Sequence, residues 1–503
     1  MSSLDPEFLA LPLASLRSAA IQRAEELGCS NAELRVERIR SQAVALRDGK
    51  LETTADDTEL GMGLRVIHDG VLGFAATVEL HPDSAARLAE QAVALAKAVS
   101  AAATERVELA DEPSNGEAVW VADFEIDPTS VTLSEKVSLL ENWSRQLLSA
   151  PGVDHTMAVV IAVAEDKYYA DLTGKVVNQR RVRVNPRIEA MAVDRETGDF
   201  ESMRTLAPPV GRGWEYLQGR GGWDFDEELA SMPELLAEKV AAPSIDPGRY
   251  DLVIDPSNLW LTIHESVGHA TELDRALGYE AAYAGTSFAT FDKLGTLQYG
   301  SQLMNVTGDR TTPFGLATVG YDDEGVTAQS FDVVRDGVLV GYQLDRRMAK
   351  ANRLGRSNGC AFADSPLHVP IQRMANISLR PAGSEGPTTE EIIATTDRGI
   401  YILGDKSWSI DMQRYNFQFT GQRFFLIDKG RLRGQVKDVA YQATTTDFWG
   451  AMDAIGGTST YVLGGAMNCG KGQPGQVAPV SHGCPTARFV QINVLNTRAE
   501  SGR

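Results

Sequence analysis

The stretch RYDLVIDPSNLWLTIHESVGHATELDRALGYE, residues 249–280, carries the most informative pattern in the chain. Residues 251–254 are apolar enough to predict a short buried strand. Asp255 is a good helix N-cap, and Pro256 suits the first helical position, where its missing N–H is not needed. The predicted helix runs to about Leu277, and Gly278 is placed to end it.

Two histidines on this helix, His264 and His269, flank a glutamate, Glu265. Zinc peptidases commonly place two histidines four residues apart on one helical face, with a glutamate as general base beside the first. Here the spacing is five, which separates the side chains by about 140° instead of about 40° on a regular helix. A π-bulge absorbs one extra residue, and such bulges collect at functional sites. We therefore predict a distorted helix between Glu265 and His269, with Gly268 easing the distortion.

A metal is one of two interpretations of these histidines, since isolated histidines on helices usually lie at the surface or in a satisfied core. The neighbouring glutamate, the well-marked helix and the thiols elsewhere in the chain favour zinc. A catalytic zinc keeps three protein ligands and one position for water. The residues alone leave several candidates for the third ligand: Glu272, Asp274, His482, Cys469 and Cys484. Cys469 stands in a glycine-flanked loop, whereas Cys29 and Cys360 have no such context.

Composition excludes several classes of protein. The 503 residues carry a net charge of −20, which argues against nucleic acid or an anionic membrane as a partner. The N-terminus lacks the pattern of a signal peptide, and no apolar stretch is long enough to span a membrane. Four cysteines are too few for a disulfide scaffold, so we expect a reducing cytoplasm.

The order of predicted elements indicates an α+β fold and not a doubly wound parallel sheet. Helices are expected near 12–27, 82–101 and 132–149, with strands over 156–195. Asp-Gly or Lys-Gly pairs at 48–49, 69–70, 336–337 and 429–430 predict hairpins. We expect an N-terminal α+β domain over 1–204, a glycine-rich linker and helix over 205–245, and a catalytic domain over 246–503. That last domain is mainly β and carries the metal-binding helix.

Two motifs together resemble the TldD/PmbA family of zinc metallopeptidases, specifically its TldD-type catalytic member. They are HESVGHATELD, residues 264–274, and the Cys-Gly-Lys at 469–471. The similarity extends over nearly the whole chain, including residues 33–67, 321–347 and the GIYI at 399–402. A Gly-rich stretch typical after that last element is replaced by residues 404–409. The departure borders the expected substrate path and leaves peptide preference open. Cys484 stands where the family usually has a glutamine.

The resemblance implies that zinc is bound by His264, His269 and Cys469, while Glu265 activates water. It also implies small or unfolded peptides as substrates, each held in extended form as an added strand inside an enclosed cavity. TldD-type chains commonly pair with a metal-free, PmbA-type (TldE-like) partner, so we expect a dimer with such a partner or with a second copy.

Two other functions remain open at this stage. A cysteine hydrolase would use Cys469 as nucleophile with a histidine base such as His482. A binding or modulator protein would hold unfolded peptides without cutting them. The glutamate beside a metal histidine favours the peptidase, because a binder has no need of a general base.

Overall fold

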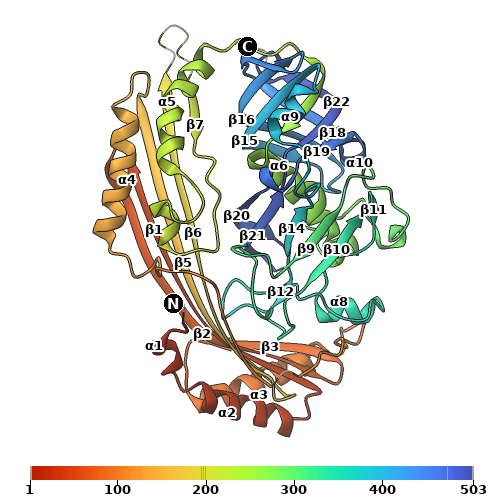
Figure 1. Ribbon diagram of the computed structural model, residues 1–503. Helices are drawn as coiled ribbons and strands as arrows, with labels where there is room; N and C mark the ends of the chain where they lie inside the picture. Colours follow the sequence, from red (N-terminus) through yellow and green to blue (C-terminus); the bar gives the residue numbers. More distant parts are fainter. Residues whose placement is uncertain are drawn as a thin grey trace.

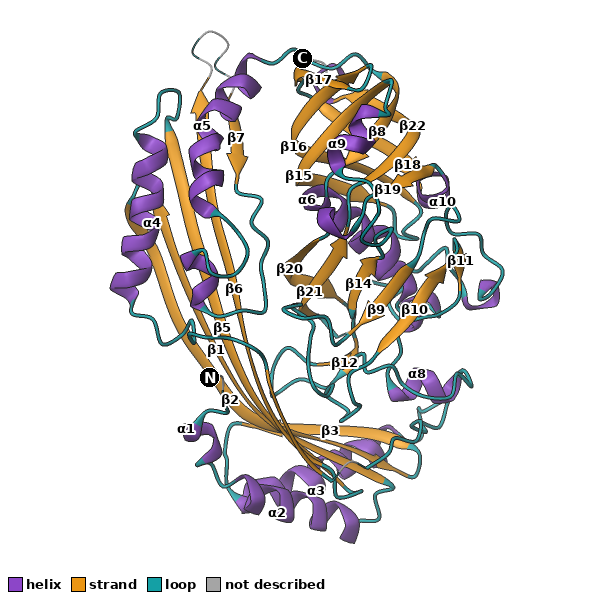
Figure 2. Ribbon diagram, in the orientation of Figure 1, coloured by secondary structure: helices purple, strands orange, loops and turns teal. Residues whose placement is uncertain are grey.

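The fold is α+β, as predicted, with long strands in its N-terminal part and short strands and barrel-like closure in its C-terminal part (Figures 1 and 2). The computed structural model describes residues 3–500 except 115, 194, 196, 197, 199 and 473. Within that range, no helix combines the length and apolar character needed to cross a membrane.

The N-terminal part is a twisted sheet in the order β3-β2-β1-β5-β6-β4, with β7 beside β6. Its strands are β1 (Asn31–Arg47), β2 (Lys50–His68), β3 (Val71–Thr77), β4 (Glu117–Val121), β5 (His155–Asp171), β6 (Val176–Val193) and β7 (Phe200–Arg204). Its helices are α1 (Pro6–Leu9), α2 (Leu13–Glu26), α3 (Pro82–Val99), α4 (Leu133–Leu148) and α5 (Phe225–Ala241).

Each end of this long sheet has its own apolar core. Helices α2 and α3 cover one end, where Leu16 and Leu88 are buried with Leu34 and Leu64 of β1 and β2. Helices α4 and α5 cover the other end (Figure 1). The hairpin turns lie where they were predicted: Asp48 and Gly49 both have positive φ, 49° and 71°, between β1 and β2. That conformation matches the right-handed twist of the paired strands.

The C-terminal part is built around a closed ring of strands. Strand β15 pairs with both β8 and β16, which closes the path β15-β8-β22-β18-β16, and β17 and β19 are attached to it. These strands are β8 (Gly248–Ile254), β15 (Arg398–Ile410), β16 (Asn416–Asp428), β17 (Arg431–Gln435), β18 (Val439–Thr444), β19 (Met452–Ile455) and β22 (Ala487–Asn496).

Smaller sheets lie between this ring and the N-terminal part. One has the order β11-β10-β9-β14, and β12-β13 and β20-β21 are two-stranded. The strands are β9 (Val306–Asp309), β10 (Ser330–Arg335), β11 (Val338–Leu339), β12 (Ala361–Phe362), β13 (Ile371–Gln372), β14 (Asn376–Leu379), β20 (Val462–Lys471) and β21 (Gln476–Cys484). The remaining helices of this part are α6 (Pro256–Ile263), α7 (Leu273–Ala276), α8 (Arg346–Ala351), α9 (Thr389–Ala394), α10 (Thr445–Gly450) and α11 (Thr497–Glu500).

A set of charges, buried except for the partly exposed Arg346, joins the two parts. Lys167 on β5 contacts Asp323 at 2.6 Å, and Arg65 on β2 contacts Glu324 at 2.7 Å. We call this set the interface cluster; its members are Glu33, Arg35, Glu37, Arg65, Glu165, Lys167, Arg181, Arg183, Asp323, Glu324 and Arg346. The segment after β7 crosses between the parts, and α5 packs on α4, β6 and β7. The domain limits at 204/205 and 245/246 stay predictions.

Candidate metal centre

The predicted helix begins where the sequence indicated and is distorted where the spacing required it. Asp255 accepts a hydrogen bond from the Ser257 backbone N–H at 2.9 Å, and Pro256 opens α6. A π-helical turn then covers His264–Gly268. The predicted distortion between Glu265 and His269 is therefore confirmed. The extra residue in this turn brings two histidines five apart onto one side.

The prediction that one helix continues to Leu277 is wrong. After a 3-10 turn over His269–Thr271 the backbone becomes extended at Glu272, with ψ at 115°, and the short α7 follows. Gln343 explains the break, because its N–H donates to the Thr271 carbonyl and its side-chain amide to the Gly268 carbonyl. Carbonyls bound in this way no longer need helical partners. Gly278 ends α7 with φ at 88°, as expected.

Gly268 is needed for space and not for an unusual backbone conformation. Its φ is −54°, which any residue adopts. A Cβ at this position would lie 2.6 Å from the Met374 Sδ and 3.5 Å from the His482 Cε1. Its backbone conformation therefore gives no support to the expectation that Gly268 eases the helical distortion. Gly268 instead leaves room beside the π turn for Met374, which precedes β14, and for His482 of β21.

Cys469 reaches the π turn from β20. It follows an irregularity in the β20-β21 pairing between Ala466 and Cys469. The Cys469 Sγ lies 3.6 Å from the His269 Nε2, and one ligand atom each from His264, His269 and Cys469 falls within 4.8 Å of the others. All three residues are buried. We call them the His-His-Cys cluster.

The geometry and the donor types fit zinc. Two ligands at ordinary Zn–N and Zn–S lengths, placed tetrahedrally, stand roughly 3.5 Å apart, close to the separation of His269 and Cys469. Two imidazoles and a thiolate are donors that zinc accepts readily, and three protein ligands leave one position for water.

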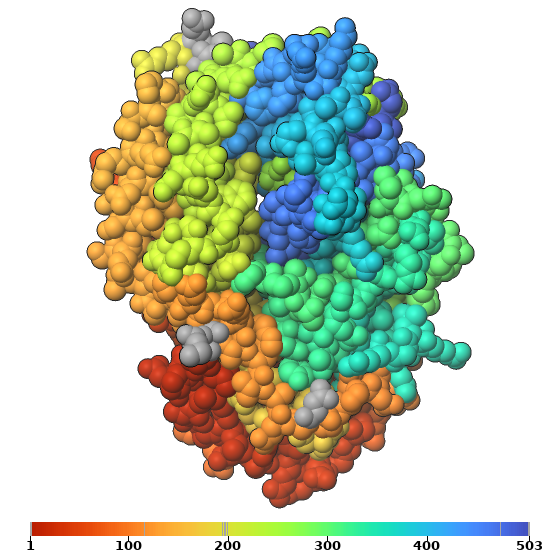
Figure 3. Space-filling view, in the orientation of Figure 1, coloured from red at the N-terminus to blue at the C-terminus, as the bar shows by residue number. Residues whose placement is uncertain are grey.

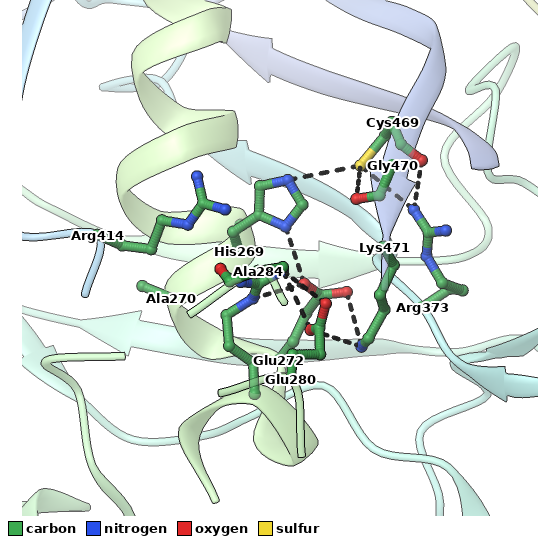
Figure 4. A network of polar contacts seen from close by, with 12 residues as sticks. His269, Ala270, Glu272, Glu280, Ala284, Arg373, Arg414, Cys469, Gly470 and Lys471 are labelled. Atoms are coloured by element: carbon green, nitrogen blue, oxygen red, sulfur yellow. Dashed lines mark hydrogen bonds and ion pairs between the residues drawn. The ribbon is translucent and has the colours of Figure 1, made fainter. Parts of the chain in front are cut away.

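The ring orientation of both histidines is fixed by partners on the other nitrogen. The His269 Nδ1 is 2.9 Å from a Glu272 carboxylate oxygen, which leaves Nε2 facing Cys469 (Figure 4). The His264 Nδ1 is 2.7 Å from the His482 Nε2, and the His482 Nδ1 donates to the Ile377 carbonyl at 2.8 Å. Such partners set the tautomer that presents a lone pair to a metal.

The ionisation of these groups suits metal binding. Burial lowers the pKa of His264. Burial and the neighbouring His264 hold the pKa of His482 well below its usual value. Both rings are therefore neutral. Burial acts to raise the pKa of the Cys469 thiol, but His269 and Arg373 outweigh it and the pKa falls. The Arg373 guanidinium donates to the Cys469 Sγ at 3.3 Å. A thiolate is the form of cysteine that binds metals.

Behind the His-His-Cys cluster lies a set of compensated charges. Lys471 on β20 contacts Glu272 at 3.2 Å (Figure 4). It also contacts Asp274 at 2.8 Å. Burial opposes ionisation of Glu272, yet Lys471 and His269 keep its pKa well below the usual range. Glu272 is therefore a charged acceptor that orients His269.

The candidate base Glu265 is buried beside the cluster and is held by a cation. The Arg414 guanidinium donates to a Glu265 carboxylate oxygen at 2.7 Å. Burial acts to raise the pKa of Glu265, but His264, His269 and Arg414 together lower it. The carboxylate is ionised, which a general base requires.

The other candidate ligands take different places. Glu272 and His482 contact the histidines, and Asp274 contacts Lys471. The Cys484 Sγ faces the Pro256 carbonyl, 3.8 Å away, and burial raises its pKa well above normal. Among the described residues, the group of ligand atoms that lie within 4.8 Å of one another includes neither Cys29 nor Cys360. Arg373 and Arg414 were not anticipated, because no local pattern marks two arginines that reach the site from distant loops.

Two sequence profiles of one family match the chain. They are the PmbA/TldA metallopeptidase C-terminal domain over residues 247–496 and the PmbA/TldA metallopeptidase domain 1 over residues 32–96. The chain belongs to the TldD/PmbA family. The His-His-Cys cluster and Glu265 all lie within the first of these matches.

Several relatives carry metalloprotease names. A metalloprotease of Methanothermobacter thermautotrophicus is 27% identical over 93% of this chain and 95% of its own length. A zinc metalloprotease TldD homolog of Saccharolobus solfataricus is 21% identical over 94% of this chain and 98% of its own. The chain thus falls in a family of metallopeptidases, and zinc is named for one of these relatives.

Solved structures share the fold of the TldD/PmbA chain. A Thermotoga maritima protein described as a modulator of a DNA gyrase matches with a TM-score of 0.73 at 15% identity, covering 96% of this chain and all of the other. TldE from Thermococcus kodakarensis matches with a TM-score of 0.69 at 16% identity, covering 95% and 99%. At such identities the likeness establishes the fold and nothing about activity.

Proposed function

We propose that this chain is a zinc-dependent peptidase that hydrolyses small or unfolded peptides held in extended form. The proposal rests mainly on one observation: the ligand atoms of His264, His269 and Cys469 lie close together, beside the buried and ionised Glu265. When bound there, zinc would supply a water of lowered pKa and polarise the scissile carbonyl.

In this proposal Glu265 is the general base. Its carboxylate takes the proton of the attacking water and passes it to the leaving amine. Arg414 holds the carboxylate in its ionised form and fixes its direction, at 2.7 Å. His269 is fixed by Glu272, and His264 by His482, so neither ring needs to reorient during a reaction.

Strand β20 supports the proposal of an extended substrate. Among the described strands it pairs with β21 alone, so no strand is paired with its other edge, and near that edge the Cys469 carbonyl accepts from the Arg373 guanidinium at 2.6 Å. A peptide added at such an edge gains affinity from main-chain hydrogen bonds with little demand on sequence. A folded protein cannot offer that strand, which restricts the substrate to small or unfolded chains.

We further propose a dimer, with a TldE-like, metal-free partner or with a second copy, in a reducing cytoplasm. TldE of Thermococcus kodakarensis shares the fold along nearly the whole chain, which supports such a pairing. The four cysteines are free in the described structure, which agrees with a reducing compartment.

The alternative of a cysteine hydrolase with His482 as base has less support. Both ring nitrogens of His482 are engaged, one with His264 and one with the Ile377 carbonyl. Neither is left to take a proton from Cys469. One solved structure with the same fold is described as a modulator of a DNA gyrase. The experiment below therefore also tests the alternative that the chain binds peptides without cleaving them.

Cleavage of an unfolded protein substrate, such as casein, tests the proposal. We expect zinc-loaded protein to cleave it and 1,10-phenanthroline to abolish cleavage, with recovery on adding zinc. Glu265→Gln should keep its zinc and lose activity by about 10²- to 10⁴-fold. Cleavage that survives the chelator would favour the thiol mechanism, and cleavage by zinc-loaded Glu265→Gln would remove the base assignment.

A further inference from the structure

A cavity of about 470 Å³ lies between the N-terminal part and the closed ring of strands, next to the metal centre. The segment after β7 forms one wall, with Leu206 and Pro208. Strands β15 and β20 form another, with Lys406, Trp408 and Met467. The space-filling view is hollowed between these segments, at the boundary of the yellow-green and dark blue regions (Figure 3). Its size is in the ordinary range for small-ligand sites.

Residues that line this cavity are close neighbours in the chain of two members of the His-His-Cys cluster, His264 and Cys469. Trp260 lines it and lies one helical turn before His264, with the two ring centroids 6.3 Å apart. Met467 and Asn468 line it and directly precede Cys469 on β20. A peptide paired with the free edge of β20 near Cys469 would therefore place neighbouring side chains in the cavity.

The apolar part of the wall centres on two indoles. Trp260 contributes one, and its Nε1 is bound to an Asp405 carboxylate oxygen at 3.3 Å. Trp408 contributes the other and is 52% exposed, which leaves much of its ring open to a ligand. Leu206 and Leu261 complete this side. Such a surface favours a large apolar or aromatic side chain.

The charge of the wall is set by Lys406. Asp405 is neutralised by Arg204, and Arg187 is paired with Glu189 at 3.0 Å. Lys406 has no carboxylate within ion-pair distance among the described residues. It thus presents an uncompensated positive charge in a chain whose net charge is −20. The overall charge repels acidic peptides, so this ammonium is the feature that would favour an acidic side chain locally.

We propose that this cavity is a specificity subsite for an extended peptide, taking a large apolar or aromatic side chain against Trp408 and an acidic side chain against Lys406. The inference rests on the proposed function and deepens it by naming the substrate class.

The charge half is tested with short capped peptides that share one phenylalanine and differ at the next position as Glu, Gln or Lys. Wild type should prefer Glu over Lys in kcat/KM, and Lys406→Glu should reverse the order, each by about fivefold. The matched control is Lys50→Glu, which makes the same charge change at an exposed hairpin residue that does not line the cavity. An unchanged order in Lys406→Glu, or the same reversal in Lys50→Glu, would overturn the assignment.

The apolar half is tested with peptides that carry Phe or Ala at the same position. Trp408→Ala should reduce the preference for Phe by about threefold to tenfold. Phe200→Ala is the control, because Phe200 is also exposed, at 67%, and does not line the cavity. A preference for Phe that survives Trp408→Ala would contradict the subsite.

Binding separates this inference from the proposed peptidase activity. The same fluorescently labelled peptides are titrated against Glu265→Gln, alone and combined with Lys406→Glu or Trp408→Ala, and followed by anisotropy. Preference in binding without cleavage by zinc-loaded wild type would support the subsite and reject the peptidase. Cleavage with no preference that depends on Lys406 or Trp408 would reject the subsite and leave the peptidase intact.

Discussion

The molecule buries two groups of ionisable side chains, and they differ in what they can hold. In the interface cluster each charge faces an opposite charge, as Lys167 faces Asp323, Glu37 and Glu165. In the metal centre the His-His-Cys cluster gathers two imidazoles and a thiol whose donor atoms face one another, while the charged groups Glu272 and Lys471 lie behind them.

The difference shows that buried charge alone does not indicate a catalytic site. Carboxylates and cations at ion-pair distance compensate one another's charge, whereas neutral imidazoles and a thiolate turn donor atoms toward a shared centre that can hold a metal. We expect changes in the interface cluster to alter folding and leave zinc unaffected. Changes behind the His-His-Cys cluster should alter zinc affinity more than folding.

The largest effect is expected from Lys167→Met in the interface cluster. Removal of the ammonium leaves Asp323, Glu37 and Glu165 buried without their shared partner, which should lower the free energy of unfolding by about 3–5 kcal/mol. Urea unfolding with Lys50→Met as the exposed control measures it. Zinc content of the folded fraction should not change. A variant as stable as wild type would show that the cluster does not hold the two parts together.

A pH dependence should follow from Glu37 in the same cluster. Burial, aided by Glu165, raises the pKa of Glu37 to about 7 against the opposing effect of Lys167. The folded state then holds a proton that the unfolded state has lost, so stability declines as pH rises from about 4.5 to about 7. The decline is at most about 3 kcal/mol. It should be absent in Glu37→Gln, and equal pH profiles of the two proteins in urea unfolding would contradict it.

Behind the metal centre, Glu272→Gln should weaken zinc binding by about tenfold. The neutral amide is a poorer acceptor for the His269 Nδ1–H and makes the ring a weaker donor to the metal. Competition with a zinc-binding dye measures the affinity. Glu280→Gln is the matched control, because Glu280 contacts Arg275 and the Gly472 N–H but not His269. Equal losses in both variants would indicate a general effect of charge.

A smaller effect is expected from His482→Phe. The ring retains its stacking on Trp260 but no longer accepts the hydrogen bond of His264. Zinc affinity should fall by a few-fold up to about tenfold, because the lost acceptor is neutral. The same dye competition measures it. Loss of all zinc would instead make His482 a ligand.

Local features of the molecule could be predicted from the sequence, and long-range ones could not. Each hairpin turn, such as that at Asp48-Gly49, can be predicted from two adjacent residues. The π turn can be predicted from the spacing of two histidines within a stretch of six residues. The break at Glu272 could not be predicted, since Gln343 causes it from a distant segment. Arg414 contacts Glu265 for the same kind of reason: tertiary packing, and not a local pattern, brings it there.

The central claim is that Cys469 completes a zinc site with His264 and His269. Zinc per folded chain, measured by inductively coupled plasma mass spectrometry, tests it in wild type, Cys469→Ala and Cys484→Ala. The second variant is the matched control, because Cys484 is also buried but faces the Pro256 carbonyl. We expect wild type and Cys484→Ala to retain zinc through dialysis and Cys469→Ala to lose it. Full zinc in Cys469→Ala, or its loss in Cys484→Ala alone, would contradict the account.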